Sequence, residues 1–304
     1  MSLVVTGTIG IDSIETPTGK VESVMGGSCS YFAAAASHLC PVRIVGAVGG
    51  DWPEAHKEVL ESFSNIDQGG LEHRADSRTF AWGGKYMENL SERETLFTEL
   101  GVLEEEPPPV PDAYADSSFI FLANTHPAVQ LNMLEQFPNR RLAVVDTMNL
   151  WIDTARDQLL DLFQKVDGVI VNDLEATELT GITNAISAGH AILDMGPGFV
   201  VIKKGEHGAV LVHEDGLAVI PAYPAAHEQV VDPTGAGDSF AGGMMGHVAS
   251  IDQVDLPALQ QGLAWGTVMA SFTIESFGLE GLQRTNETMI TERLEQFRCL
   301  ARIG

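Results

Sequence analysis

A strand-like run at 217–223 and a helical run from residue 239 flank one glycine-rich segment, Asp232-Pro233-Thr234-Gly235-Ala236-Gly237-Asp238. Its glycines lie at the predicted helix N-terminus, where unpaired backbone N–H groups and the positive end of the helix dipole bind anions. Because glycine has no Cβ atom, an anion can approach this backbone closely. Asp238 falls in the first helical turn. The segment therefore predicts a site for a phosphate-like group with a carboxylate beside it.

Three interpretations of this segment compete. The first is an ordinary turn before a helix, with an acidic residue favoured by the helix dipole. The second is a dinucleotide-binding G-x-G-x-x-G turn, which is disfavoured because Phe240 occupies the sixth position and the segment lies late in the chain. The third is a phosphoryl-transfer site, in which Gly235, Ala236 and Gly237 form an anion hole and Asp238 is the base. A P-loop is excluded, because the chain has no G-x-x-x-x-G-K-[ST] sequence.

Short apolar runs alternate with helical patterns for most of the chain. Buried strands are predicted at 3–6, 42–48, 119–122, 142–145, 169–171 and 200–202. Helices are predicted at 28–39, 53–63, 127–137, 154–164, 185–193, 239–250, 256–275 and 287–300. This alternation is typical of a mainly parallel sheet with helices on both faces. We therefore expect one three-layer α/β/α domain over residues 1–304.

Two polar, turn-rich stretches interrupt the alternation, at about 13–25 and 71–101. Their alternating pattern is typical of exposed hairpins, so we expect a small β-sheet lid; ordinary surface hairpins are the alternative. Exposed strand edges can pair between subunits, so a homodimer through the lid is an open expectation.

The composition limits the expected partners. Acidic residues outnumber basic ones, 42 to 17, and the formal net charge is −25. Such a surface repels phosphate backbones and anionic headgroups, so neither nucleic acid nor a membrane is expected as a partner. The three cysteines lack metal-ligand spacing and favour a reducing, cytoplasmic setting. The N-terminal residues read as a strand, and apolar runs stay below the about 20 residues that span a bilayer.

Residues 232–240, which read Asp-Pro-Thr-Gly-Ala-Gly-Asp-Ser-Phe, resemble the C-terminal signature of the ribokinase-like (PfkB) carbohydrate kinases. That family also includes adenosine and other nucleoside kinases. The resemblance extends over nearly the whole chain and implies a ribokinase-like fold with a small lid. It also implies an ATP-dependent kinase that uses Mg²⁺ and moves the γ-phosphoryl group to a primary hydroxyl of a small-molecule substrate, with Asp238 as the base.

Further segments resemble the family's acceptor site. Asp12 follows the first strand, and the resemblance implies that it holds sugar hydroxyl groups; a solvated loop acid is the alternative. Gly26, Gly27 and Ser28 resemble the N-terminal Gly-Gly signature, with a capped helix start as the alternative. This segment lacks the Lys and Asn of the sugar-kinase version, which favours a nucleoside of adenosine type over ribose or fructose.

Two more segments resemble the family's nucleotide and metal positions. Asn172 and Glu175 resemble its N-x-x-E element, which orders Mg²⁺ mostly through water. Lys203, Gly205 and Gly208 resemble its turn near ATP, and an exposed β-turn is the alternative. A non-catalytic nucleotide or sugar sensor on the same fold stays open, because fold alone does not fix function.

Overall fold

The computed structural model describes residues 2–90 and 92–301. Its centre is a nine-stranded sheet in which the strands from β11 through β5 run parallel, while β12 and β13 extend the β11 edge in antiparallel order. In spatial order the strands are β13 (Gly216–Ile220), β12 (Ala209–His213), β11 (Phe199–Lys203), β10 (Gly168–Asn172), β9 (Leu142–Asp146), β8 (Phe119–Leu122), β1 (Leu3–Thr6), β4 (Val42–Gly49) and β5 (Ile66–Arg74). The predicted mainly parallel sheet is confirmed. Of the expected domain, residues 1, 91 and 302–304 lie outside the described residues.

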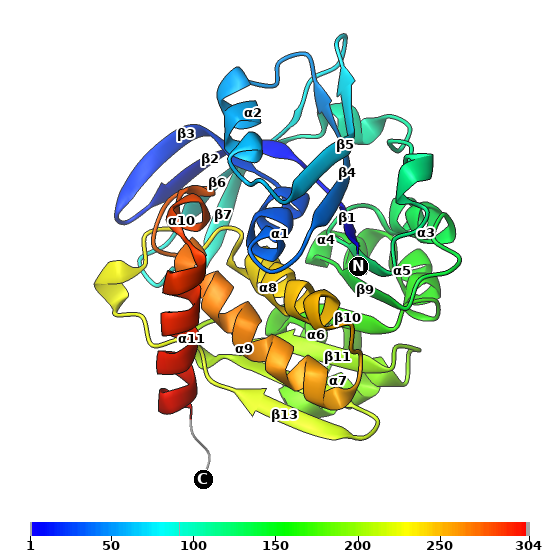
Figure 1. Ribbon diagram of the computed structural model, residues 1–304, viewed down its shortest axis with the longest axis vertical. Helices are drawn as coiled ribbons and strands as arrows, with labels where there is room; N and C mark the ends of the chain where they lie inside the picture. Colours follow the sequence, from blue (N-terminus) through cyan, green and yellow to red (C-terminus); the bar gives the residue numbers. More distant parts are fainter. Residues whose placement is uncertain (1, 91, 302–304) are drawn as a thin grey trace.

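Helices cover both faces of this sheet (Figure 1). One face carries α1 (Ser28–Ser37), α2 (Glu54–Glu61), α8 (Ala236–Ile251), α9 (Leu256–Thr273), α10 (Glu280–Arg284) and α11 (Glu287–Leu300). The other carries α3 (Pro127–Glu135), α4 (Asn149–Thr154), α5 (Arg156–Phe163), α6 (Asp173–Thr180) and α7 (Ala185–Leu193). Because successive strand side chains point to opposite faces, Leu3 and Val5 join the first core and Val4 the second. The three-layer α/β/α arrangement is thus confirmed. Within residues 2–90 and 92–301, no helix is long and apolar enough to cross a membrane.

A separate four-stranded sheet lies beside the main one, at the upper left of Figure 1. Its order is β3 (Gly19–Gly26), β2 (Gly10–Thr16), β6 (Phe80–Tyr86) and β7 (Arg93–Glu99). We call it the lid sheet. The expected segment at 71–101 begins inside β5, which pairs with β4 in the main sheet, so the lid strand itself starts at Phe80.

Most predicted helix boundaries agree with the structure within two residues, and the helices predicted at 239–250 and 154–164 differ most. The helix α8 starts at Ala236 rather than at residue 239, because Gly235 adopts the left-handed conformation (φ 74°, ψ 0°) and caps the helix. The glycine-rich turn therefore is the start of the helix. The predicted helix at 154–164 overlaps the end of α4 and contains α5, and Ala155 between them leaves the helical region with φ −135° and ψ 29°.

Glycines let α8 lie directly against the helices on either side of it. A Cβ atom at Gly242 would lie 2.3 Å from the carbonyl oxygen of Phe32 in α1. A Cβ atom at Gly243 would lie 2.8 Å from the carbonyl oxygen of Trp265 in α9. These backbone contacts fix the position of α8 and therefore of its N-terminus.

We predict that Gly242→Ala lowers the free energy of unfolding. Alanine gains about 1 kcal/mol in helix propensity, but its Cβ atom would collide with the Phe32 backbone, and overpacking of this kind costs about 1–3 kcal/mol. Urea titration followed by circular dichroism would show a lower midpoint. Glu292→Ala on the exposed face of α11 is the control and should shift unfolding by less than about 0.5 kcal/mol. A Gly242→Ala midpoint at or above that of the wild type would contradict the close contact.

Candidate active site

The carboxyl ends of several parallel strands meet the N-terminus of α8. Asp146, Asn172 and Lys203 are the last residues of β9, β10 and β11. Strand register places Asn172 opposite Lys203, and Ile170 of the same strand opposite Asp146. In open α/β sheets, ligands bind at this edge. The structure therefore brings the predicted residues of β10, β11 and α8 to one place.

The glycine-rich segment forms a tight turn that leads into α8. Asp232 accepts a hydrogen bond from the Thr234 N–H at 2.9 Å, and the Ala236 N–H donates to the Pro233 carbonyl at 3.2 Å. A Cβ atom on Gly235 would lie 2.3 Å from the ring of Tyr31, so only glycine fits against that ring. Of the three predicted anion-hole amides, that of Ala236 is thus already engaged in a turn.

Lys203 lies next to this helix start. A Cβ atom on Gly237 would lie 2.8 Å from the Nζ atom of Lys203, so the absence of a side chain there makes room for the ammonium group. Burial raises the pKa of Asp238 to about 6, and the charges of Lys203 and Arg93 oppose the rise. Burial also raises the pKa of Asp146, again with Lys203 opposing. One ammonium group therefore offsets several buried acids.

Asp12 is a buried carboxyl group and not a solvated loop acid. It lies within β2 and is 4% exposed. Burial raises its pKa to about 8, and Asp232 and Asp238 add to the rise. Among the residues that the structure describes, its Oδ1 atom has no hydrogen-bond partner. A Cβ atom on Gly26 would lie 2.0 Å from Oδ2, so this glycine makes the space for the carboxyl group. A buried acceptor without a partner suits a ligand hydroxyl.

Ser28 has a structural task beside that acid. Its hydroxyl accepts from the Thr8 N–H at 3.3 Å and donates to the Asn124 carbonyl at 3.3 Å. Gly27 adopts φ 93°, and a Cβ atom there would lie 2.4 Å from the Thr8 carbonyl oxygen. The contacts of Gly27 and Ser28 thus hold the chain between β1 and β2, and a role at the acceptor stays a prediction.

Asn172 and Glu175 form a reciprocal cap at the start of α6. The Asn172 side chain accepts from the Glu175 N–H at 2.8 Å, and the Glu175 carboxylate accepts from the Asn172 N–H at 2.7 Å. Burial raises the pKa of Glu175, with Lys203 opposing. In the described part of the chain, no three Asp, Glu, His or Cys side chains group as a metal site. Oxygen donors of this kind fit Mg²⁺ held through its waters rather than by direct chelation.

The segment after β11 is a tight glycine turn. Gly205 and Gly208 have φ values of 52° and 87°, and the Lys204 N–H donates to the Gly208 carbonyl at 2.7 Å. A Cβ atom on Gly208 would lie 1.9 Å from the Ile220 carbonyl oxygen. The glycines are explained by this geometry, and contact with ATP stays a prediction.

The sequence did not identify the residues that connect the lid sheet to the glycine-rich segment. The Thr234 hydroxyl donates to the Tyr86 hydroxyl at 3.1 Å, and the Thr18 hydroxyl donates to the Val231 carbonyl at 3.0 Å. Arg93 of β7 acts electrostatically on Asp238. Thr234 belongs to the glycine-rich segment, but no motif marks Thr18 or Arg93. The only available signal was an arginine inside a lid strand of a strongly acidic chain.

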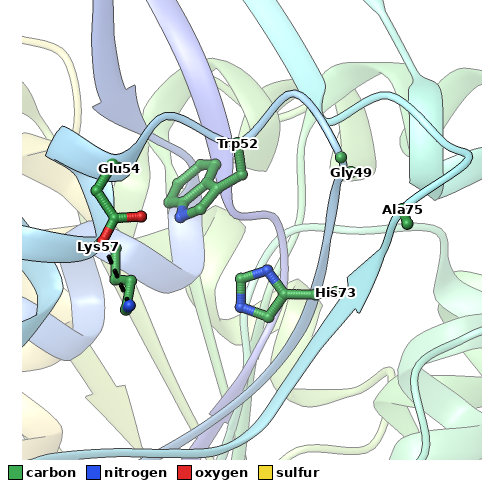
Figure 2. A pocket seen from close by; sticks show the side chains of 7 residues that line it. Gly49, Trp52, Glu54, Lys57, His73 and Ala75 are labelled. Atoms are coloured by element: carbon green, nitrogen blue, oxygen red, sulfur yellow. Dashed lines mark hydrogen bonds and ion pairs between the residues drawn. The ribbon is translucent and has the colours of Figure 1, made fainter.

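A separate depression of about 340 Å³ lies at the ends of β4 and β5 (Figure 2). Trp52, Lys57 and His73 line it, and none of the acids described above does. The Gly49 N–H at its edge donates to the Thr79 hydroxyl at 2.9 Å, directly before β6. The depression therefore marks the attachment of the lid sheet to the main sheet.

Comparison with known proteins gives a consistent result. The model of the pfkB family carbohydrate kinases matches residues 2–285. The cytidine kinase of Thermococcus kodakarensis is 31% identical over 250 residues, which are 81% of this chain and 87% of that protein. The nucleoside kinase of Methanothermobacter thermautotrophicus is 27% identical over 87% of this chain and 83% of its own.

Solved structures share the fold. The nucleoside kinase of Methanocaldococcus jannaschii, described as an archaeal member of the ribokinase family, superposes with a TM-score of 0.77 at 20% identity, over 97% of this chain and 98% of that one. The aminoimidazole riboside kinase of Salmonella enterica, complexed with aminoimidazole riboside and an ATP analog, gives 0.77 at 16% identity, over 97% and 100%. The fold is therefore ribokinase-like, and the chain belongs to the pfkB family of carbohydrate kinases.

Proposed function

We propose that this kinase transfers the γ-phosphoryl group of ATP to a primary hydroxyl of a nucleoside, with Asp238 as the general base. One juxtaposition carries the proposal: the N-terminus of α8, the Lys203 ammonium group beside Gly237, and the half-buried carboxylate of Asp238 lie together. The first two stabilise negative charge on a phosphoryl group, and the third accepts a proton.

The transfer proceeds in line. The acceptor oxygen attacks phosphorus, its proton moves to Asp238, and the bond between phosphorus and the ADP oxygen breaks. The Gly235 and Gly237 amides and the dipole of α8 stabilise the phosphoryl oxygens, while Lys203 adds charge from β11. When bound, Mg²⁺ neutralises the ATP phosphates, and Asn172 and Glu175 would hold it through water. Positioning contributes most in such a loose transition state.

Asp12 would hold the acceptor. Its free Oδ1 atom and its burial suit a pair of ribose hydroxyl groups. The relatives named as cytidine and nucleoside kinases support a nucleoside, and an adenosine-like acceptor is the one that we favour. Asp12 would bind the hydroxyls of a free sugar in the same way, so ribose or fructose is the second candidate.

Purified protein with ATP and Mg²⁺ should release ADP in the presence of an acceptor, and fastest with a nucleoside. The panel comprises adenosine, cytidine, inosine, ribose and fructose. Asp238→Asn keeps the size of the side chain but cannot accept the proton, so kcat should fall at least about 10²-fold. The control Asp161→Asn, on the exposed face of α5, should behave as wild type. Near wild-type kcat in Asp238→Asn would refute the base, and no ADP release with any acceptor would refute the function.

The kcat/KM of phosphoryl transfer should fall at acidic pH. A general base works only when unprotonated, and burial raises the pKa of Asp238 to about 6. Below that pH, kcat/KM should drop about tenfold per pH unit, and above about pH 7 it should level off. The profile would be measured between about pH 5 and 8, with circular dichroism to confirm folding. The residual kcat/KM of Asp238→Asn should not show this fall at acidic pH. If the wild-type kcat/KM fell only near pH 4, the ordinary range of aspartate, the raised pKa of the base would be contradicted.

We also infer a homodimer formed through the lid sheet. The strand β7 lies at its edge, and Leu96 and Phe97 are 51% and 40% exposed. An unpaired edge with apolar side chains favours pairing with a second copy. Leu96→Glu should lower the dimer fraction in sedimentation velocity, whereas Leu174→Glu, 71% exposed on α6, should not. Wild-type protein that sediments as a monomer at every concentration would exclude this dimer.

A further inference from the structure

One face of the lid sheet is turned toward the glycine-rich segment. Strand register pairs Asp12 of β2 with Trp82 of β6, and Tyr86 of β6 with Arg93 of β7. Cross-strand partners share a face, and so do Trp82 and Tyr86, which are an even number of residues apart on one strand. The Tyr86 hydroxyl accepts the hydrogen bond from Thr234 at 3.1 Å, so this face is the inner one. Arg93 therefore points to the same side as Asp12.

Aromatic side chains hold the guanidinium group of Arg93. Its central carbon lies 5.4 Å from the centroid of the Trp82 ring. Gly84 makes this possible, because a Cβ atom there would lie 2.0 Å from the same ring. Tyr86 is the cross-strand partner of Arg93. Both aromatic partners are uncharged, so they fix the position of Arg93 without neutralising it.

The charge of Arg93 reaches acids on three different elements. Burial raises the pKa values of Asp238 in α8, Glu175 in α6 and Asp12 in β2, and Arg93 opposes the rise at each. Lys203 acts on Asp238 and Glu175 from β11. The guanidinium group thus lies within electrostatic range of the predicted base, the metal-ordering acid and the acceptor-binding acid together.

We propose that Arg93 contacts the transferring phosphoryl group from the lid side, an assignment that rests on the proposed kinase function. Asp238 interacts electrostatically with both Asp12 and Glu175, and the incoming phosphoryl group adds further negative charge. The start of α8 and Lys203 offset that charge from the main sheet. Arg93 offsets it from the lid, with a planar fork that matches two phosphoryl oxygens. Arg93 exchanges no proton; the acceptor proton goes to Asp238, as the new phosphorus–oxygen bond forms and the bond to ADP breaks.

The test compares Arg93→Ala and Arg93→Lys with Lys85→Ala. Lys85 is a cation one residue from Tyr86 on the same strand, so it points to the outer face of the lid sheet, where it pairs with Glu15. Arg93→Ala should lower kcat about 10²-fold and leave the acceptor KM within a factor of about two. Arg93→Lys should retain part of the rate, and Lys85→Ala all of it. Calorimetry measures binding independently of turnover. Arg93→Ala should bind ADP with wild-type affinity but should bind ADP with aluminium fluoride, a planar phosphoryl mimic, more weakly than the wild type does.

Unchanged kcat in Arg93→Ala would overturn the assignment. A raised acceptor KM with unchanged kcat would also overturn it, because Arg93 would then bind the acceptor rather than the phosphoryl group. Equal affinity of wild type and Arg93→Ala for the fluoride complex would do the same. Wild-type protein that phosphorylates no acceptor would remove the proposed function itself, whereas active wild type with fully active Arg93→Ala removes only this contact.

Discussion

Carboxyl groups from two strands, two helices and a loop lie around the start of α8: Asp12, Asp146 and Asp232 are buried, and Glu175 and Asp238 are half-buried. A buried charge is costly unless a partner offsets it, and burial is the largest cause of the raised pKa at each of these groups. The chain has a net charge of −25, so the protein as a whole repels phosphate. Any anion bound here depends on local donors. In the proposed function, the helix N-terminus, Lys203 and Arg93 are those donors.

Glycines set the geometry on which this balance depends. Gly26 makes room for the Asp12 carboxyl group, and Gly237 makes room for the Lys203 ammonium group. Gly235 fits against Tyr31, while Gly242 brings α8 against the backbone of α1. A side chain at any of these positions would move either a charge or the helix start. The glycines therefore act first on packing and, through packing, on the electrostatics of the site.

The sequence predicted the parts of the site that a local pattern encodes. Alternation of apolar runs predicted the strands of the parallel sheet, and the segment before α8 predicted a helix N-terminus with Asp238 in its first turn. Patterns could not predict contacts between distant segments. The engagement of Ser28 with Asn124, for example, joins residues 96 positions apart. Arg93 belongs to no motif, because its place follows from the pairing of β6 with β7 and from the bond between Tyr86 and Thr234.

Contacts of the lid sheet with the glycine-rich segment would link acceptor binding to the position of that segment. Thr234 hydrogen-bonds to Tyr86 of β6, and Thr18, in the turn between β2 and β3, hydrogen-bonds to the Val231 carbonyl. Asp12 lies in β2 of the same sheet. An acceptor that Asp12 binds as proposed, and that also touches the start of α8, would stabilise the arrangement in which the lid sheet lies on the glycine-rich segment. A ligand that favours one state shifts the population toward it. Under the proposed function, that state would also bring Arg93 to the phosphoryl group and exclude water, the competing acceptor. Under the proposed function, ATP without an acceptor therefore meets an incomplete set of charges, which protects it from hydrolysis.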